Sequence, residues 1–178
     1  MKKVLVISSS MRKGGNSEIL AQSFAQGAKE AGHGVEFISL LGKKLDFCKG
    51  CLVCQNTEKC VIADDAGKIA ASMKNADVLA FATPIYYYEM SGQLKTLLDR
   101  MNPLFPSDYA FREVYFLSAA ADTDAATDEI ALQGLKGWIR CFGKAKLAGK
   151  VFAGGATDVG DIKKHKALQE AKNLGLKV

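Results

Sequence analysis

The sequence predicts an α/β fold, a doubly wound parallel sheet with helices packed on both of its faces. Short runs rich in β-branched residues and leucine alternate along the chain with segments whose apolar residues recur at helical spacing. Such alternation builds βαβ units, which pair their strands in parallel through right-handed crossovers. No repeat or break in composition divides the 178 residues. We therefore expect one domain over residues 1–178.

Five short apolar runs are predicted as strands buried on both faces. The first is Val4 to Ile7, where four consecutive residues are β-branched or leucine. Pro84 is expected to end the third strand, because proline cannot donate to the ladder of a central strand. The predicted strands cover residues 4–7, 35–41, 77–83, 113–117 and 151–153.

Five segments are predicted as helices because their apolar residues mark one helical face. In the first, Leu20, Phe24 and Ala28 recur at this spacing before Gly32 ends the pattern. Asp64 and Asp65 supply the acidic start that favours a helix N-terminus. The predicted helices cover residues 17–31, 65–75, 90–101, 125–142 and 161–173.

Composition limits the classes of function. The chain is 48% hydrophobic and 24% charged, as is typical of globular proteins. Its first apolar run is too short for a signal peptide, and no run approaches the length of a membrane span. We therefore expect a cytoplasmic protein with reduced cysteines and no membrane partner. The net charge of +5 comes from scattered lysines, which suit a phosphorylated small molecule and do not predict a nucleic-acid partner.

Four of the five cysteines lie within thirteen residues, at Cys48, Cys51, Cys54 and Cys60. Their C-x2-C-x2-C-x5-C spacing shares its first three positions with cysteine runs that bind a [4Fe-4S] cluster. Structural zinc is less favoured, because zinc sites usually join ligand pairs from separate segments. The remaining alternative is four reduced cysteines that bind no metal. The spacing alone leaves a cluster and metal-free thiols open.

The loop after the first strand carries serines and glycines and leads directly into a helix, over residues 8–17. Hydroxyl groups, free backbone amides and the positive end of a helix dipole together suit a phosphate. Neither G-x-G-x-x-G nor a Walker A motif is present, which disfavours dinucleotides and nucleoside triphosphates. A serine-rich helix cap without a ligand remains the alternative.

In the loop after the third strand, Pro84 and Ile85 are followed in sequence by Tyr86, Tyr87 and Tyr88. Aromatic and backbone groups there could hold a flat ring system, or they could fill a subunit interface. Since ligands of open α/β sheets bind outside the carboxyl ends of the strands, this loop, the serine loop and the cysteine loop are expected side by side.

Three motifs together resemble the NADPH-dependent FMN reductase family and its relatives, the iron-sulfur flavoproteins. They are Ser-Ser-x-Arg-x-x-Gly-Asn-Ser, a Cys-x-Gly-Cys-x-x-Cys loop leading to Lys-Cys-Val-Ile-x-Asp-Asp, and Thr-Pro-Ile-Tyr-Tyr followed by Ser-Gly-Gln-Leu-Lys-Thr-Leu-Leu-Asp-Arg. The resemblance covers about residues 1–120 and is most specific from Pro84 to Arg100.

The resemblance implies a flavodoxin-like sheet of strand order 2-1-3-4-5 with FMN at the strand ends. It also implies which residues hold FMN: near the phosphate, Ser8, Ser10, Arg12, Asn16 and Ser17; near the isoalloxazine ring, Pro84, Ile85, Tyr86, Tyr87, Ser118 and Ala119. The iron-sulfur flavoproteins imply Cys48, Cys51, Cys54 and Cys60 as cluster ligands.

Our leading hypothesis is an FMN oxidoreductase that passes electrons from NAD(P)H to a small acceptor such as a quinone, free flavin or nitroaromatic. It needs no dedicated catalytic acid or base, and none is predicted. The second hypothesis is an electron carrier with FMN and a [4Fe-4S] cluster served by a ferredoxin-like donor. A third is a flavin-binding regulatory module. The resemblance further implies a homodimer or homotetramer.

Overall fold

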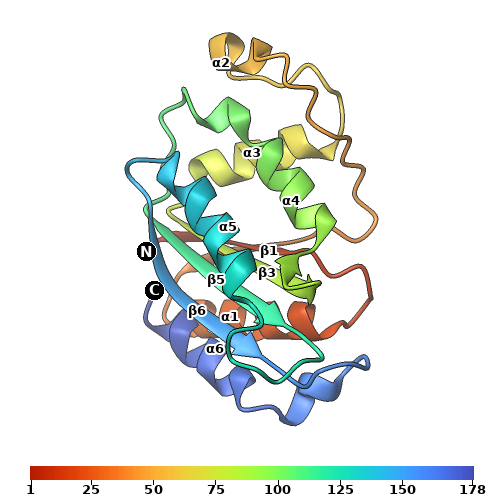
Figure 1. Cartoon of the computed structure of the whole chain (residues 1–178). Coiled ribbons are helices and arrows are strands. Elements are labelled where there is room, and N and C mark those ends of the chain that lie inside the picture. Colours follow the sequence, from red (N-terminus) through yellow and green to blue (C-terminus); the bar gives the residue numbers. More distant parts are fainter.

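The computed structural model describes residues 1–178 as a parallel sheet between two layers of helices (Figure 1). The parallel strands lie in the order β2-β1-β3-β5-β6. This order confirms the predicted 2-1-3-4-5 arrangement, because β4 is only a two-residue strand added antiparallel to the end of β3. The strands are β1 (Lys3–Ser8), β2 (Gly34–Ser39), β3 (Val78–Tyr86), β4 (Glu89–Met90), β5 (Glu113–Ala119) and β6 (Lys146–Ala153).

The side chains of β1 show how one strand serves two cores, because successive residues point to opposite faces of a sheet. Val4 and Val6 pack in the core beneath α1 (Asn16–Glu30) and α6 (Ala167–Leu176). Leu5 and Ile7 pack in the second core. That core lies beneath α3 (Asp65–Asn75), α4 (Gly92–Asp99) and α5 (Glu129–Arg140). No helix is long and apolar enough to cross a membrane.

Several boundaries differ from those predicted. β3 continues through Pro84, because Ile85 and Tyr86 pair with β4. The last predicted helix is divided into a 3-10 turn, η2 (Asp161–Lys164), and α6. Three short elements were not predicted from the apolar pattern: β4, α2 (Val53–Thr57) and the 3-10 turn η1 (Asn102–Leu104). α2 holds only five residues, too few for helical periodicity to appear.

Candidate functional site

A cleft of about 430 Å³ lies at the carboxyl edge of the sheet, where the loops after β1, β5 and β6 meet the last residues of β3. Its volume falls in the usual range for cofactor sites. The lining residues share small or apolar side chains, apart from one arginine, one tyrosine and one threonine. They are Arg12, Pro84, Ile85, Tyr86, Ala119, Ala120, Ala121, Ala156 and Thr157.

The N-terminus of α1 lies a few residues beyond Arg12, which lines the cleft. Gly15 caps the helix without any side-chain hydrogen bond, and the first N–H groups of a helix have no acceptor within it. A Cβ atom at Gly15 would collide with Ser10 Oγ and lie only 2.9 Å from the carbonyl oxygen of Arg12. Glycine is therefore required for this tight turn, which leaves amides and a helix dipole facing a potential anion.

The serines of this turn are buried and bond mostly within it. Ser8 is fully buried, and its Oγ accepts a hydrogen bond from the amide of Ser10 at 3.4 Å. Ser10 Oγ donates to the carbonyl of Arg12 at 2.9 Å. Ser17 is buried in the first turn of α1. The hydroxyls of Ser8 and Ser10 thus shape the turn between β1 and α1, and Ser17 lies in the first turn of that helix.

Arg12 and Asn16 bind a segment that sequence reasoning did not assign to the site. Arg12 Nη2 donates to the carbonyl of Thr157 at 2.9 Å. Asn16 Nδ2 donates to the carbonyl of Asp158 at 2.9 Å, and its Oδ1 accepts from the amide of Gly160 at 3.1 Å. The chain after β6 therefore closes over the serine turn. The only sequence signal was the pair of glycines after that strand, which indicates a turn but no partner.

The tyrosines separate into one that lines the cleft and two that do not. Tyr86 lines the cleft beside Pro84 and Ile85. Tyr87 and Tyr88 form the two-residue turn between β3 and β4, with φ of 52° and 66°. Tyr87 is fully exposed. Two positive φ values suit a hairpin turn but strain bulky residues. Tyr86 is therefore better placed than Tyr87 to touch a ligand in the cleft.

Ser118 lies behind the cleft wall that Ala119 begins. Its side chain is fully buried and donates to Asp128 Oδ2 at 2.7 Å, and Lys150 Nζ lies 3.2 Å from Asp128 Oδ1. Burial opposes the charge of Lys150, but hydrogen bonds to Glu129 and Asp128 outweigh it and raise its pKa. The hydrogen bond between Ser118 and Asp128 thus fixes the end of β5. No pattern in the sequence around Asp128 had indicated that it is the partner of Ser118.

Cys54 and Cys60 do not lie beside the cleft, which corrects our expectation for these two residues. Phe47, just before the cysteine run, does line a hollow with Met11 of the serine loop and Gly92 at the start of α4. Figure 1 shows α2 at the opposite end of α4 from the arrowheads of β5 and β6. α2 packs against η1, just beyond the C-terminal end of α4. The cleft lies near the other end of α4, whose length is about 12 Å. The chain after β2 does not turn back into a helix at once, as a compact βαβ unit would, but runs out along α4.

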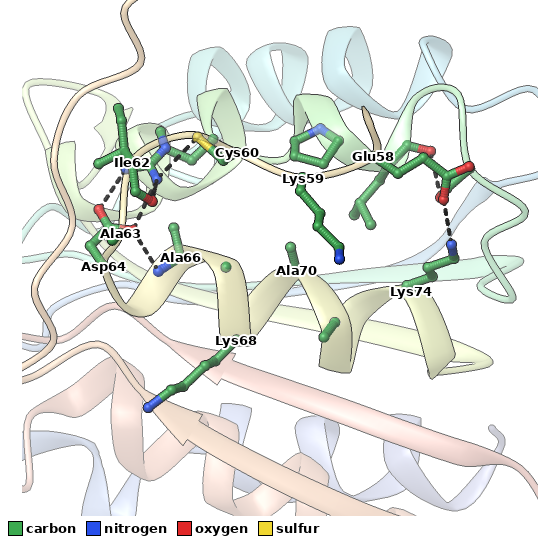
Figure 2. Close-up of a pocket in the computed structure, with 16 residues that line it drawn as sticks. Glu58, Lys59, Cys60, Ile62, Ala63, Asp64, Ala66, Lys68, Ala70 and Lys74 are labelled. Atoms are coloured by element: carbon green, nitrogen blue, oxygen red, sulfur yellow. Dashed lines mark hydrogen bonds and ion pairs between the residues drawn. The ribbon is translucent and has the colours of Figure 1, made fainter. Parts of the chain in front are cut away.

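Arg100 holds the cysteine segment in this position. Its fully buried side chain donates through Nη1 to the carbonyl of Asp46 at 2.7 Å and to Asp64 Oδ2 at 2.6 Å. Through Nη2 it donates to Asp64 Oδ1 at 2.9 Å and to Cys60 Sγ at 3.4 Å. Figure 2 shows Cys60, Ile62 and Asp64 along the chain that this guanidinium binds. One side chain therefore fixes residues before and after the cysteine run.

Asp64 also caps the start of α3, where its Oδ1 accepts a hydrogen bond from the amide of Ala66 at 3.0 Å. Burial alone would raise the pKa of Asp64. Hydrogen bonds from Arg100 and from the amides of Asp46 and Ala66 outweigh burial and lower that pKa below its usual range. The carboxylate is thus ionised at neutral pH and balances the charge of Arg100.

The four cysteines divide into an inner and an outer pair. Cys54 is buried and accepts a hydrogen bond from Asn102 Nδ2 at 3.4 Å, while Cys60 is half-buried against Arg100. Cys48 and Cys51 are exposed. No three His, Cys, Asp or Glu side chains are gathered closely enough to hold a metal ion. Four sulfur ligands with two nearby N–H donors nonetheless fit the chemistry of an iron-sulfur cluster.

The strand order, together with a phosphate-suited helix start and a cleft at the carboxyl edge of the sheet, defines a flavodoxin-like protein. The comparison with protein families agrees. The chain belongs to the NADPH-dependent FMN reductase family, which it matches over residues 2–158.

Individual proteins similar to this chain include iron-sulfur flavoproteins and an azoreductase. An iron-sulfur flavoprotein of Methanocaldococcus jannaschii is 42% identical over 57% of this chain and 53% of its own length. An iron-sulfur flavoprotein of Methanosarcina thermophila is 29% identical over 87% of this chain and 82% of its own. An azoreductase of Bacillus anthracis has a TM-score of 0.74 at 17% identity over 100% of both chains, which supports the fold alone. The chain spans about half the length of the first curated relatives it matches.

Proposed function

We propose that residues 1–178 form one FMN-binding domain that transfers electrons from NAD(P)H to a small acceptor, such as a flavin, quinone or nitroaromatic. The observation that carries this proposal is the cleft itself, whose wall holds Arg12 at one side and Pro84, Ile85 and Tyr86 at another. Membership of the FMN reductase family supports it. When bound, FMN supplies a ring that accepts hydride.

The chain's part is to bind and orient this cofactor. The first-turn amides of α1 and the guanidinium of Arg12 would hold the phosphate, with Ser8, Ser10, Asn16 and Ser17 shaping and closing that end. Pro84, Ile85 and Tyr86 would lie against the ring, with Ala119 opposite and Ser118 supporting it. Tyr87 would stand outside, at the mouth of the cleft.

No Asp, Glu, His, Lys or Cys side chain lines the cleft. We therefore assign no residue of this chain a proton-transfer role. The small side chains of the alanines after β5 leave space on one side of the cleft. NAD(P)H and then the electron acceptor could approach the flavin ring through this space. Affinity and access, rather than acid or base strength, would then set the rate.

A second candidate function is that of an iron-sulfur flavoprotein, an electron carrier served by a ferredoxin-like donor. The N–H donors next to Cys54 and Cys60 favour it, as do the names of the relatives. Cys48, Cys51, Cys54 and Cys60 would hold a [4Fe-4S] cluster that supplies one-electron transfer. The two functions are compatible on one chain, because the cleft and the cysteine segment use different residues.

We place this activity in the cytoplasm, because all five cysteines are free thiols. We also propose a homodimer or homotetramer. The exposed tyrosines at the tip of the β3–β4 turn offer an apolar surface for a second copy of the chain.

The test is an absorbance spectrum of anaerobically purified protein before and after NADPH. The reductase proposal expects bound FMN whose absorbance near 450 nm is bleached within seconds. Iron and sulfide with a shoulder near 400 nm, but no bleaching by NADPH, would favour the electron carrier. FMN that neither bleaches nor accompanies iron would contradict both and favour a regulatory module.

A further inference from the structure

Two side chains at the end of α4 direct N–H groups at the inner pair of cysteines. Asn102 Nδ2 lies 3.4 Å from Cys54 Sγ, and Arg100 Nη2 lies 3.4 Å from Cys60 Sγ. Both distances are hydrogen bonds to sulfur, which are longer than those to oxygen. The exposed Cys48 and Cys51 accept no side-chain donor, and only the amide of Gly50 approaches Cys48, at 3.5 Å. The sulfur environment is therefore asymmetric.

Arg100 is held in place by partners other than sulfur, and Asn102 is placed by the 3-10 turn that it begins. Arg100 is fixed by Asp64 and by the carbonyl of Asp46. Asn102 begins η1, which packs against α2, the helix that carries Cys54. Neither N–H group must move to reach its sulfur. The arrangement is thus built by the fold and is not a chance contact of an exposed loop.

An N–H group next to a sulfur ligand stabilises the additional negative charge that reduction brings to an iron-sulfur site. We propose that Asn102 and Arg100 are positioning residues of the cysteine site. They hold Cys54 and Cys60 as its inner ligands and raise its reduction potential, while Cys48 and Cys51 form a solvent-facing half. This inference rests on the iron-sulfur function proposed above and concerns residues outside the four-cysteine motif.

Asn102→Leu tests the inference most cleanly, because leucine keeps a similar volume and removes a side-chain amide whose hydrogen bond goes to Cys54 Sγ. Asn75→Leu is the matched control, since Asn75 is exposed and its amide bonds to the carbonyl of Ala71, away from any sulfur. The measurements are iron, sulfide and FMN content, followed by a potentiometric titration of the anaerobic protein. We expect Asn102→Leu to retain FMN and to show a lower midpoint potential, with Asn75→Leu unchanged from the wild type.

Loss of iron from Asn102→Leu alone, with FMN retained, would also support the positioning role. An unchanged potential with full iron content would overturn it. Wild-type protein that contains FMN but no iron would overturn this inference together with the electron-carrier proposal, and would leave the reductase proposal intact. Absence of FMN from the wild type would instead contradict the reductase proposal.

Arg100→Lys provides a second measurement, because it keeps the positive charge next to Asp64 but loses the planar fork that reaches Cys60. We expect iron content to fall more than FMN content in this variant. Equal loss of both would show that Arg100 acts only through folding. If the variant does not fold, the Asn102 measurement decides.

Discussion

The two ends of α4 are held in different ways. At its start, Ser91 Oγ caps the helix and donates to Ser9 Oγ at 2.8 Å, while its amide donates to Thr83 Oγ1 at 2.9 Å. Ser9 directly follows β1 and Thr83 lies within β3, so this end is placed by the sheet itself. At the other end, Arg100 places the cysteine segment through an ion pair and two carbonyl bonds. The position of the cleft is therefore set by the sheet topology. The position of the cysteine segment is set by the buried charge of Arg100.

The largest expected effect is on the cysteine end. Asp64→Asn leaves the Arg100 guanidinium buried without its counter-ion, and removing one partner of a buried pair typically costs about 3–5 kcal/mol. We expect a loss of this size in the free energy of unfolding at pH 7, measured by urea denaturation. Asp99→Asn is the control, because its pair with Lys95 is exposed and should cost under about 1 kcal/mol.

The same pair predicts a dependence on pH. Because the pKa of Asp64 is lower in the folded protein than in the unfolded chain, its stabilisation is present above an unfolded pKa of about 3.9. It is lost as pH falls through the folded pKa. The difference in the free energy of unfolding between the wild type and Asp64→Asn should therefore become smaller as pH is lowered below about 4. A constant difference would mean that the carboxylate is not what balances Arg100.

A smaller effect is expected at the cleft. Gly15→Ala places a Cβ against Ser10 Oγ and the carbonyl of Arg12, so the turn must shift. Overpacking of this kind costs about 1–3 kcal/mol, and here we expect the cost to appear as weaker FMN binding in a fluorescence titration. Gly67→Ala on α3 meets only open space and should bind FMN as the wild type does. Equal affinities in both variants would remove the serine turn from the site.

A still smaller effect on FMN binding is expected when two neighbouring tyrosines are replaced in turn. Tyr86→Ala removes an aromatic wall of the cleft, a contact worth about 0.5–1.5 kcal/mol. Tyr87→Ala removes only a fully exposed ring. The flavin absorbance maximum and FMN affinity should therefore change in the first variant and not in the second. A larger change in Tyr87→Ala would show that the tip of the turn folds over the cleft.

This contrast also explains what the sequence could predict. Strand order and the position of the serine and tyrosine loops follow from hydrophobic periodicity and βαβ topology, as the two cores sharing β1 show. The path of residues 40–64 depends instead on which distant carbonyls and carboxylate Arg100 binds, and no local pattern encodes such a choice. The closure of the serine turn by residues 157–160, through Arg12 and Asn16, depends on equally distant contacts.

The smallest expected effect tests the central claim that the FMN cleft and the cysteine segment are separate sites. Cys48 and Cys51 are exposed, and neither lines the cleft. The double variant Cys48→Ser/Cys51→Ser should unfold within about 0.5 kcal/mol of the wild type. The decisive measurement is the dissociation constant of FMN for this variant. We predict the wild-type value, and a tenfold or greater loss of affinity in a folded variant would contradict the account.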